Sequence, residues 1–346
     1  MKPLKFVRFA ALLSLPATVV LAVVVLAQQP ASPGKPSDVK LSGPYTHDNL
    51  TIFLVHGEDH LKGRTFLTLP EALQQKKFVI HETQSVNQLT MENLSPTEEV
   101  LILSGDILKG GQQDRIAQFD ILVPPKSGKL PLQAFCVELT AARWMRKLEG
   151  KDKTFEGSPF NSVSNSVRLA TRYQMNQSEV WKQVAEIQKQ LSEKAGKSVK
   201  DKESDSSLAL SLKIKEVREA TERYTTKLKD IFQGKQDVIG YVFAINGKVI
   251  AADIYGSPVL FRKVWPRLLD ANGIEAFAER PKDGMYDKAT AADVRAFFDE
   301  AAKGKASTRD VGKGVRQITN DSKRNVQFET QDLKSGTTLR KNILAH

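Results

Sequence analysis

Short alternations of apolar and polar residues dominate the chain from Leu41 to Glu138, and this period predicts β-strands. β-Branched and aromatic residues are grouped in short runs, with turn residues between them. Pro70 begins a short helical turn among these runs, at a position where proline is tolerated. The region therefore predicts a sandwich-like or barrel-like β layer. The expected strands are 50–55, 77–82, 88–92, 100–103, 116–123 and 132–137.

The hydrophobic period lengthens to that of an α-helix at the centre of the chain. Ser178 can cap a helix that continues to about Lys194, with apolar residues on one stripe. A polar loop at 196–207 leads to a second expected helix, from about Leu208 to Phe232. We interpret the two stripes as packing surfaces of a helical pair that occupies about 178–232.

The period of two returns after the helical pair. Asn246-Gly247 lies between two strand-like runs, and this dipeptide favours the type I′ turn of a β-hairpin. A helix from Phe261 to Leu269 follows, which Pro266 is expected to start or kink. A further helix near 291–302 and one or two strands around 315–344 complete the chain. The predicted fold class is α+β in one composite domain, 41–346, with a β-rich N-terminal half, a central helical pair, and a C-terminal hairpin plus helices.

The first residues have the pattern of a secretory signal peptide. Three basic side chains precede an apolar run, and the run ends at the small residue Ala27. We expect cleavage after Ala27, export to the periplasm or the medium, and no membrane span in the cleaved protein. A retained membrane anchor is the alternative, but Pro16 within the run favours cleavage. Residues 28–40 are rich in proline, glycine and serine and predict a flexible linker.

Net charge limits the kinds of partner that we expect, and the cysteine content limits the possible disulfides. The chain has a formal net charge of +11, and most of this charge lies beyond the leader, which favours anionic partners. Lysines are spread out with few aromatic residues between them, so we expect no nucleic-acid binding. Cys136 is the single cysteine, which excludes an intramolecular disulfide. Its apolar neighbours indicate a small core residue rather than a nucleophile.

A glycine pair beside cationic residues forms the most distinctive turn of the chain. The run from Lys109 to Arg115 offers exposed backbone amides and a guanidinium that can bind phosphate or carboxylate in a bidentate manner. The alternative is a structural bulge, with Asp114 and Arg115 linking neighbouring strands. The Walker spacing of a phosphate-binding loop is absent. The candidate ligand-binding residues of this turn are Lys109, Gly110, Gly111, Gln113 and Arg115.

Three carboxylates near this turn could perform acid–base chemistry. Glu138 follows the strand of Cys136 and could meet Glu82 or Asp114 across a sheet, as in enzymes that cleave glycosidic bonds. The alternative is that Glu138 pairs with Arg143 or Arg115 and satisfies buried polar groups. Trp144 and Arg143 are further candidate ligand-binding residues, although Trp144 could instead pack in the core.

No metal or cofactor site is expected. His56 and His60 stand four residues apart, a spacing that suits zinc on a helix, but Gly57 and the preceding strand predict a turn. The chain has neither the Gly-x-Ser-x-Gly sequence of serine hydrolases nor the Gly-x-Gly-x-x-Gly sequence of dinucleotide-binding proteins.

Two motifs carry a family resemblance. They are Gly105-Asp106 with Gly110-Gly111-Gln112-Gln113-Asp114-Arg115, and Cys136-Val137-Glu138 with Arg143-Trp144. With these motifs the chain resembles the ARG- and rhodanese-phosphatase-superfamily-associated protein domain family, from about Leu41 to the C-terminus. The resemblance implies no established activity, but it does imply an association with ADP-ribosyl or nucleotide-derived chemistry.

Three functional hypotheses follow. The leading one is an exported, non-catalytic binding or accessory domain for an anionic ligand that is nucleotide-like, sugar-like or a glycan, with the ligand at the Lys109–Arg115 turn. The second is a hydrolase of ADP-ribose-like substrates that uses Glu138 and a second carboxylate. The third is a structural or protein-interaction module with the helical pair as its docking surface. The sequence identifies no protein partner.

Overall fold

The computed structural model describes residues 39–83, 85, 87–111, 113–139, 155–157, 164–312 and 314–346. Within these ranges the chain forms seven α-helices, one π-helical segment and 17 strands, which confirms the predicted α+β class. Residues 35–346 cluster as one compact unit. The predicted leader 1–27, most of the linker, Arg143 and Trp144 lie outside the described residues.

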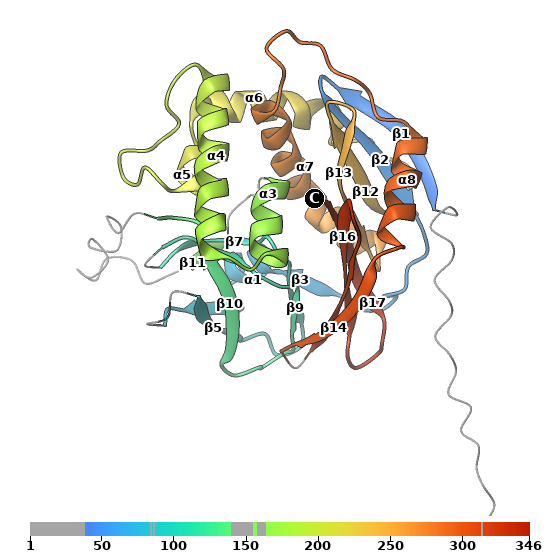
Figure 1. Cartoon of the computed structure of the whole chain (residues 1–346). Coiled ribbons are helices and arrows are strands. Elements are labelled where there is room, and N and C mark those ends of the chain that lie inside the picture. The colour runs from blue at the N-terminus through green and yellow to red at the C-terminus, as the bar shows by residue number, and fades with distance from the viewer. Residues whose placement is uncertain are drawn as a thin grey trace, which may run out of the picture. The chain divides into compact units, whose positions relative to one another are not determined.

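An antiparallel sheet of eight strands contains the strands that the structure describes in the C-terminal half, together with two strands from residues 40–56 (Figure 1). Alternate residues of each central strand face opposite sides of this sheet. One side packs on helix α7 (Pro258–Ala278), and the other packs on helix α8 (Ala291–Ala301) through a separate cluster that includes Phe53, Val242 and Phe298. Because both faces are covered, β12 is buried over its whole length. In spatial order the strands are β1 (Lys40–His47), β2 (Leu50–His56), β12 (Val238–Ile245), β13 (Lys248–Tyr255), β17 (Thr338–Ala345), β16 (Asn325–Asp332), β15 (Val315–Asp321) and β14 (Lys305–Val311).

The predicted hairpin at Asn246-Gly247 is confirmed. β12 pairs with β13, with Ile245 opposite Lys248, so that only two residues form the turn. Asn246 has φ 51° and Gly247 has φ 77°, the left-handed dihedrals that a type I′ turn needs at both central positions.

Two smaller sheets form the β-rich N-terminal half. The predicted strand 116–123 is divided between them, because residues 118–120 leave β8 before β9 begins. The six-stranded sheet contains, in order, β11 (Phe155–Gly157), β7 (Ile107–Gly110), β8 (Arg115–Ala117), β10 (Leu130–Cys136), β5 (Gln88–Asn93) and β4 (Phe78–His81). The three-stranded sheet contains β3 (Phe66–Thr68), β6 (Glu99–Ile102) and β9 (Ile121–Val123), with β3 and β6 parallel.

The helices follow the predicted order but differ in their bounds. The second helix of the central pair is interrupted between α5 and α6, at residues 212–214. The helix predicted around Pro266 is present. It begins at Pro258, with Ser257 as its N-cap, so Pro266 lies inside the helix. The bounds are α1 (Leu69–Gln74), α3 (Asn165–Arg168), the π-helical η2 (Leu169–Tyr173), α4 (Gln177–Ala195), α5 (Leu208–Ser211), α6 (Lys215–Leu228), α7 (Pro258–Ala278) and α8 (Ala291–Ala301).

The C-terminal region holds more strands than the sequence pattern indicated. The prediction of one or two strands around 315–344 was wrong, since β15, β16 and β17 all lie there and β14 precedes them. β14 has six consecutive exposed residues at the edge of the sheet, so its sequence shows no apolar alternation. Among the helices that the structure describes, none combines the length and apolar character needed to cross a membrane.

Candidate functional site

The glycine pair of the Lys109–Arg115 turn lies at the end of β7 and makes room for neighbouring side chains. Gly110 and Gly111 have φ values of 125° and 56°, which side chains rarely permit. A β-carbon at Gly111 would collide with the ring of Phe155 and with Glu82. The space above this glycine is therefore filled by the protein itself.

Asp114 and Glu138 meet in the core, as the sequence suggested for this pair. Both are fully buried, and the backbone N–H of Asp114 donates to Glu138 Oε2 at 3.1 Å. Asp114 Oδ1 accepts from the Gly110 N–H, and Oδ2 accepts from the Ser207 hydroxyl, both at 3.0 Å. Because Ser207 is the N-cap of α5, the Asp114 carboxylate ties the six-stranded sheet to the helical region.

Arg115 is a buried cation among carboxylates. It is 2% exposed, and its Nη1 donates to the Gln113 carbonyl at 2.7 Å. Its Nη2 lies 3.8 Å from Glu82 Oε2, and its Nε has no hydrogen-bond partner within the described part of the chain. Glu82 thus places negative charge beside the guanidinium, which opposes the binding of a further anion here.

We predict that Arg115→Ala lowers the free energy of unfolding by about 2 kcal/mol, because it leaves buried acceptors and Glu82 without their cation. Urea denaturation measures the change, with Lys109→Ala, a half-buried neighbour, as the control. Unchanged stability of Arg115→Ala would show that the residue is not part of the buried lattice.

Cys136 lies beside this cluster as a buried thiol. It is fully buried, and its Sγ donates to Gln113 Oε1 at 3.2 Å. Burial raises the thiol pKa to about 11, with Arg115 opposing the shift and Glu82 and Glu138 adding to it. The thiol is therefore protonated at neutral pH, the form that is not nucleophilic.

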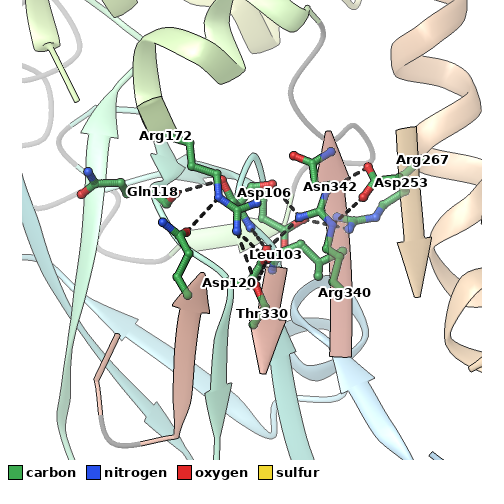
Figure 2. A network of polar contacts seen from close by, with 12 residues as sticks. Leu103, Asp106, Gln118, Asp120, Arg172, Asp253, Arg267, Thr330, Arg340 and Asn342 are labelled. Atoms are coloured by element: carbon green, nitrogen blue, oxygen red, sulfur yellow. Dashed lines mark hydrogen bonds and ion pairs between the residues drawn. The ribbon is translucent and has the colours of Figure 1, made fainter. Parts of the chain in front are cut away.

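A second buried cluster, which the sequence reasoning missed, is centred on Asp120 (Figure 2). Its Oδ1 accepts from the Ser104 N–H and from Arg340 Nη1, both at 2.7 Å. Its Oδ2 accepts from Arg172 Nη2 at 2.9 Å and from the Thr330 hydroxyl at 2.5 Å. Burial alone would raise the pKa of Asp120, but the two guanidiniums hold it well below its usual range.

The cluster extends to the large sheet through Arg340. This guanidinium also donates to both oxygens of Asp253, at 2.6 and 2.9 Å, so it joins two carboxylates. Arg172 lies 4.4 Å above the ring of Phe328, and burial lowers its pKa, although Asp120 acts in the opposite direction. Two arginines balance two aspartates, which marks a structural link rather than a site for another ion. The only local signal in the sequence is an aspartate within the apolar run 116–123.

A cavity of about 860 Å³ lies apart from both clusters, between the β14–β15 hairpin and the two smaller sheets. Apolar side chains form its floor, and Phe119 and Met91 there are at most 2% exposed. None of the ligand-binding residues proposed in the Lys109–Arg115 turn lines it. The apolar lining residues are Met91, Phe119, Ile121, Leu122, Pro124, Leu130, Pro131 and Val311.

Three carboxylates and two cations of the described residues line the cavity, and one of the carboxylates, Asp310, pairs with Arg316. Glu99 and Asp332 are both held by Arg64, at 2.9 and 2.7 Å. Arg309 lies 5.7 Å from the ring of Phe119, and within the described ranges neither it nor Lys334 pairs with a carboxylate. Both cations are exposed, so they lie where the cavity meets solvent.

The histidines of the 56–60 segment do not converge. His56 Nδ1 lies 2.8 Å from Asp237 Oδ1, and its Nε2 lies 2.8 Å from the Ser42 hydroxyl. His60 is exposed at the following turn. No group of three or more histidine, cysteine or acidic residues suited to a metal ion occurs among the described residues.

Comparison with known proteins gives one match. A family model described as the ARG and Rhodanese-Phosphatase-superfamily-associated Protein domain matches residues 38–345. No curated protein and no solved structure matches the chain.

Proposed function

The chain belongs to the ARG and Rhodanese-Phosphatase-superfamily-associated Protein domain family, and from this premise we propose that it is an exported, non-catalytic binding domain for a small anionic ligand. The ligand would occupy the cavity beside the β14–β15 hairpin rather than the Lys109–Arg115 turn. Export rests on the basic and apolar leader that ends at Ala27.

One observation carries the proposal: the cavity has two cations without carboxylate partners in the described part of the chain, above an apolar floor. Pockets of about 300–1,000 Å³ with an apolar lining and a few polar groups are the usual sites for small molecules. Arg309 can bind a phosphate or carboxylate through two N–H groups, and Lys334 adds a second positive charge.

The buried carboxylates support binding over hydrolysis. Asp114 and Glu138 accept hydrogen bonds from backbone amides and from the cap of α5, and neither lines the cavity. A general acid must reach the leaving group of its substrate. This pair is engaged in joining the sheet to the helices, so we propose no turnover at it.

We test the proposal by thermal unfolding of residues 28–346, which retain the whole compact unit 35–346. The panel contains nucleotides, ADP-ribose, sugar phosphates and carboxylates. A ligand at 100 times its Kd should stabilise the protein by about 2.7 kcal/mol, a shift of a few degrees.

Arg309→Ala combined with Lys334→Ala should abolish the ligand-induced shift without changing the unfolding of the free protein, since both side chains are exposed. Lys305→Ala, on the same strand as Arg309 but outside the cavity lining, is the control. A shift that survives in the double variant would refute the cavity as the anion site.

A further inference from the structure

We propose that the ligand of this cavity is a free single-chain anionic amphiphile, with a carboxylate or phosphate head on an acyl chain. The inference rests on the proposed function, since it concerns the same cavity, and it names the chemical class that the lining selects. It follows from three features: the floor, the scarcity of polar partners, and the position of the cations.

The floor is apolar. Ile121 and Leu122 come from β9 and Met91 from β5, and each is at most 7% exposed. Pro131 and Leu130 of β10 continue the same apolar wall. Moving methylene groups from water onto apolar side chains is favourable, and methionine adapts readily to a flexible chain.

The polar side chains that line the cavity are mostly engaged or exposed: Asp310 pairs with Arg316, and Gln133 is an exposed residue of β10. The Ser127 hydroxyl already donates to the Gly128 carbonyl and accepts from the Asn93 N–H. Glu99 and Asp332 are engaged by Arg64. A sugar or ribose buried here would bring several hydroxyl groups that lose water and gain few partners. An acyl chain carries no such groups.

The two cations lie on the solvent side of the cavity, away from its apolar floor. Arg309 is on the exposed strand β14 and Lys334 is in the turn that follows β16, so both heads lie at the solvent side of the apolar floor. An anionic head at this rim keeps part of its hydration while its chain is buried. This arrangement matches a molecule that is charged at one end and apolar along the rest.

The hairpin that carries Arg309 is seated closely on the floor. A β-carbon at Gly314 would come within 2.6 Å of the Leu122 carbonyl oxygen, so the backbone of the turn lies directly against β9. This approach fixes the rim relative to the apolar wall.

Titration calorimetry with decanoate, decanol and adenosine monophosphate tests the inference on the purified protein. Decanoate should bind at least tenfold more tightly than decanol, which lacks the charge, and than adenosine monophosphate, which has the charge on a polar body. The Arg309→Ala and Lys334→Ala double variant should weaken decanoate at least tenfold and leave decanol unchanged, and Lys305→Ala should change neither.

The outcomes separate this inference from the proposed function. Binding of adenosine monophosphate or a sugar phosphate in preference to decanoate would overturn the amphiphile and keep the anion site. Binding of phosphatidylglycerol vesicles without binding of free decanoate would overturn the free single-chain ligand in favour of a membrane surface. Absence of binding by every anion would overturn both.

Discussion

Asp120→Asn should lower the free energy of unfolding by about 3–5 kcal/mol, the largest loss expected from any single substitution considered for this protein. The side chain keeps its size, so the change removes charge rather than volume. Arg172 and Arg340 stay buried, and within the described part of the chain Arg340 retains Asp253 alone as a carboxylate partner.

Asparagine also replaces one of the two acceptor oxygens of the carboxylate with an NH₂ donor. All four contacts to Asp120 come from donors, namely two guanidiniums, the Ser104 N–H and the Thr330 hydroxyl. An amide offers one oxygen and one NH₂ group, so at least one of these donors would face another donor. Desolvation and misdirected hydrogen bonds therefore act together.

A double-mutant cycle separates the charge effect from packing. Arg172→Met removes one guanidinium and keeps an apolar contact with the ring of Phe328. Combined with Asp120→Asn, it restores the charge balance, so the double variant should be more stable than the sum of the single changes by about 1–3 kcal/mol.

Urea denaturation of the four proteins measures this coupling. Asp310→Asn, which breaks the exposed pair with Arg316, is the matched control and should change stability little. Strict additivity between positions 120 and 172 would contradict the network.

The parts of the fold that depend on neighbouring residues could be predicted from the sequence. Asn246-Gly247 sets its own dihedrals, so the hairpin of β12 and β13 follows from two residues. The helix α4 follows from its apolar stripe and ends at Gly196, which has φ 69°. Strands with one buried face, such as β5, show their alternation directly.

The parts that depend on distant residues could not be predicted. Asp120 contacts Arg172 and Arg340, which are 52 and 220 positions away in the sequence. The residues around each of them do not predict that the three side chains meet. The cavity likewise combines β9, β10 and β14, which belong to three different sheets.

The candidate residues of the Lys109–Arg115 turn show an intermediate case. Their proximity to Glu138 could be predicted, because β8 pairs with β10 and places the two motifs side by side. The partner of Asp114 could not be predicted, because its hydroxyl donor is Ser207, the N-cap of α5, which is 93 positions away in the sequence.

The second large effect that we expect is a gain in stability from Glu275→Gln, which grows as the pH rises. Glu275 lies in α7 and is 2% exposed. Burial raises its carboxyl pKa to about 7. Arg168, whose Nη2 lies 3.8 Å from Oε2, opposes this shift in part, and Glu279 adds to it. The backbone N–H of Asn165 donates to the other oxygen at 2.6 Å.

The sign of the effect follows from proton binding. The folded protein keeps the proton on Glu275 up to about pH 7, whereas the unfolded chain loses it near the ordinary pKa of 4.5. The stability that this proton contributes is therefore complete below pH 4.5 and is lost as pH rises through 7. Over that interval the wild-type protein should lose about 3 kcal/mol from this group.

Glutamine resembles the protonated carboxyl and does not titrate, so the stability difference between Glu275→Gln and wild type should grow by about 3 kcal/mol from pH 4.5 to pH 8. Urea denaturation at several pH values measures this difference, in which contributions from other titrating groups cancel. Glu193→Gln, at an exposed position on α4, is the control. A flat difference for Glu275→Gln would mean that the Arg168 guanidinium keeps the Glu275 carboxylate charged in the folded core. The link from α7 to α3 would then be a full ion pair, and its strength would not change between pH 4.5 and 8.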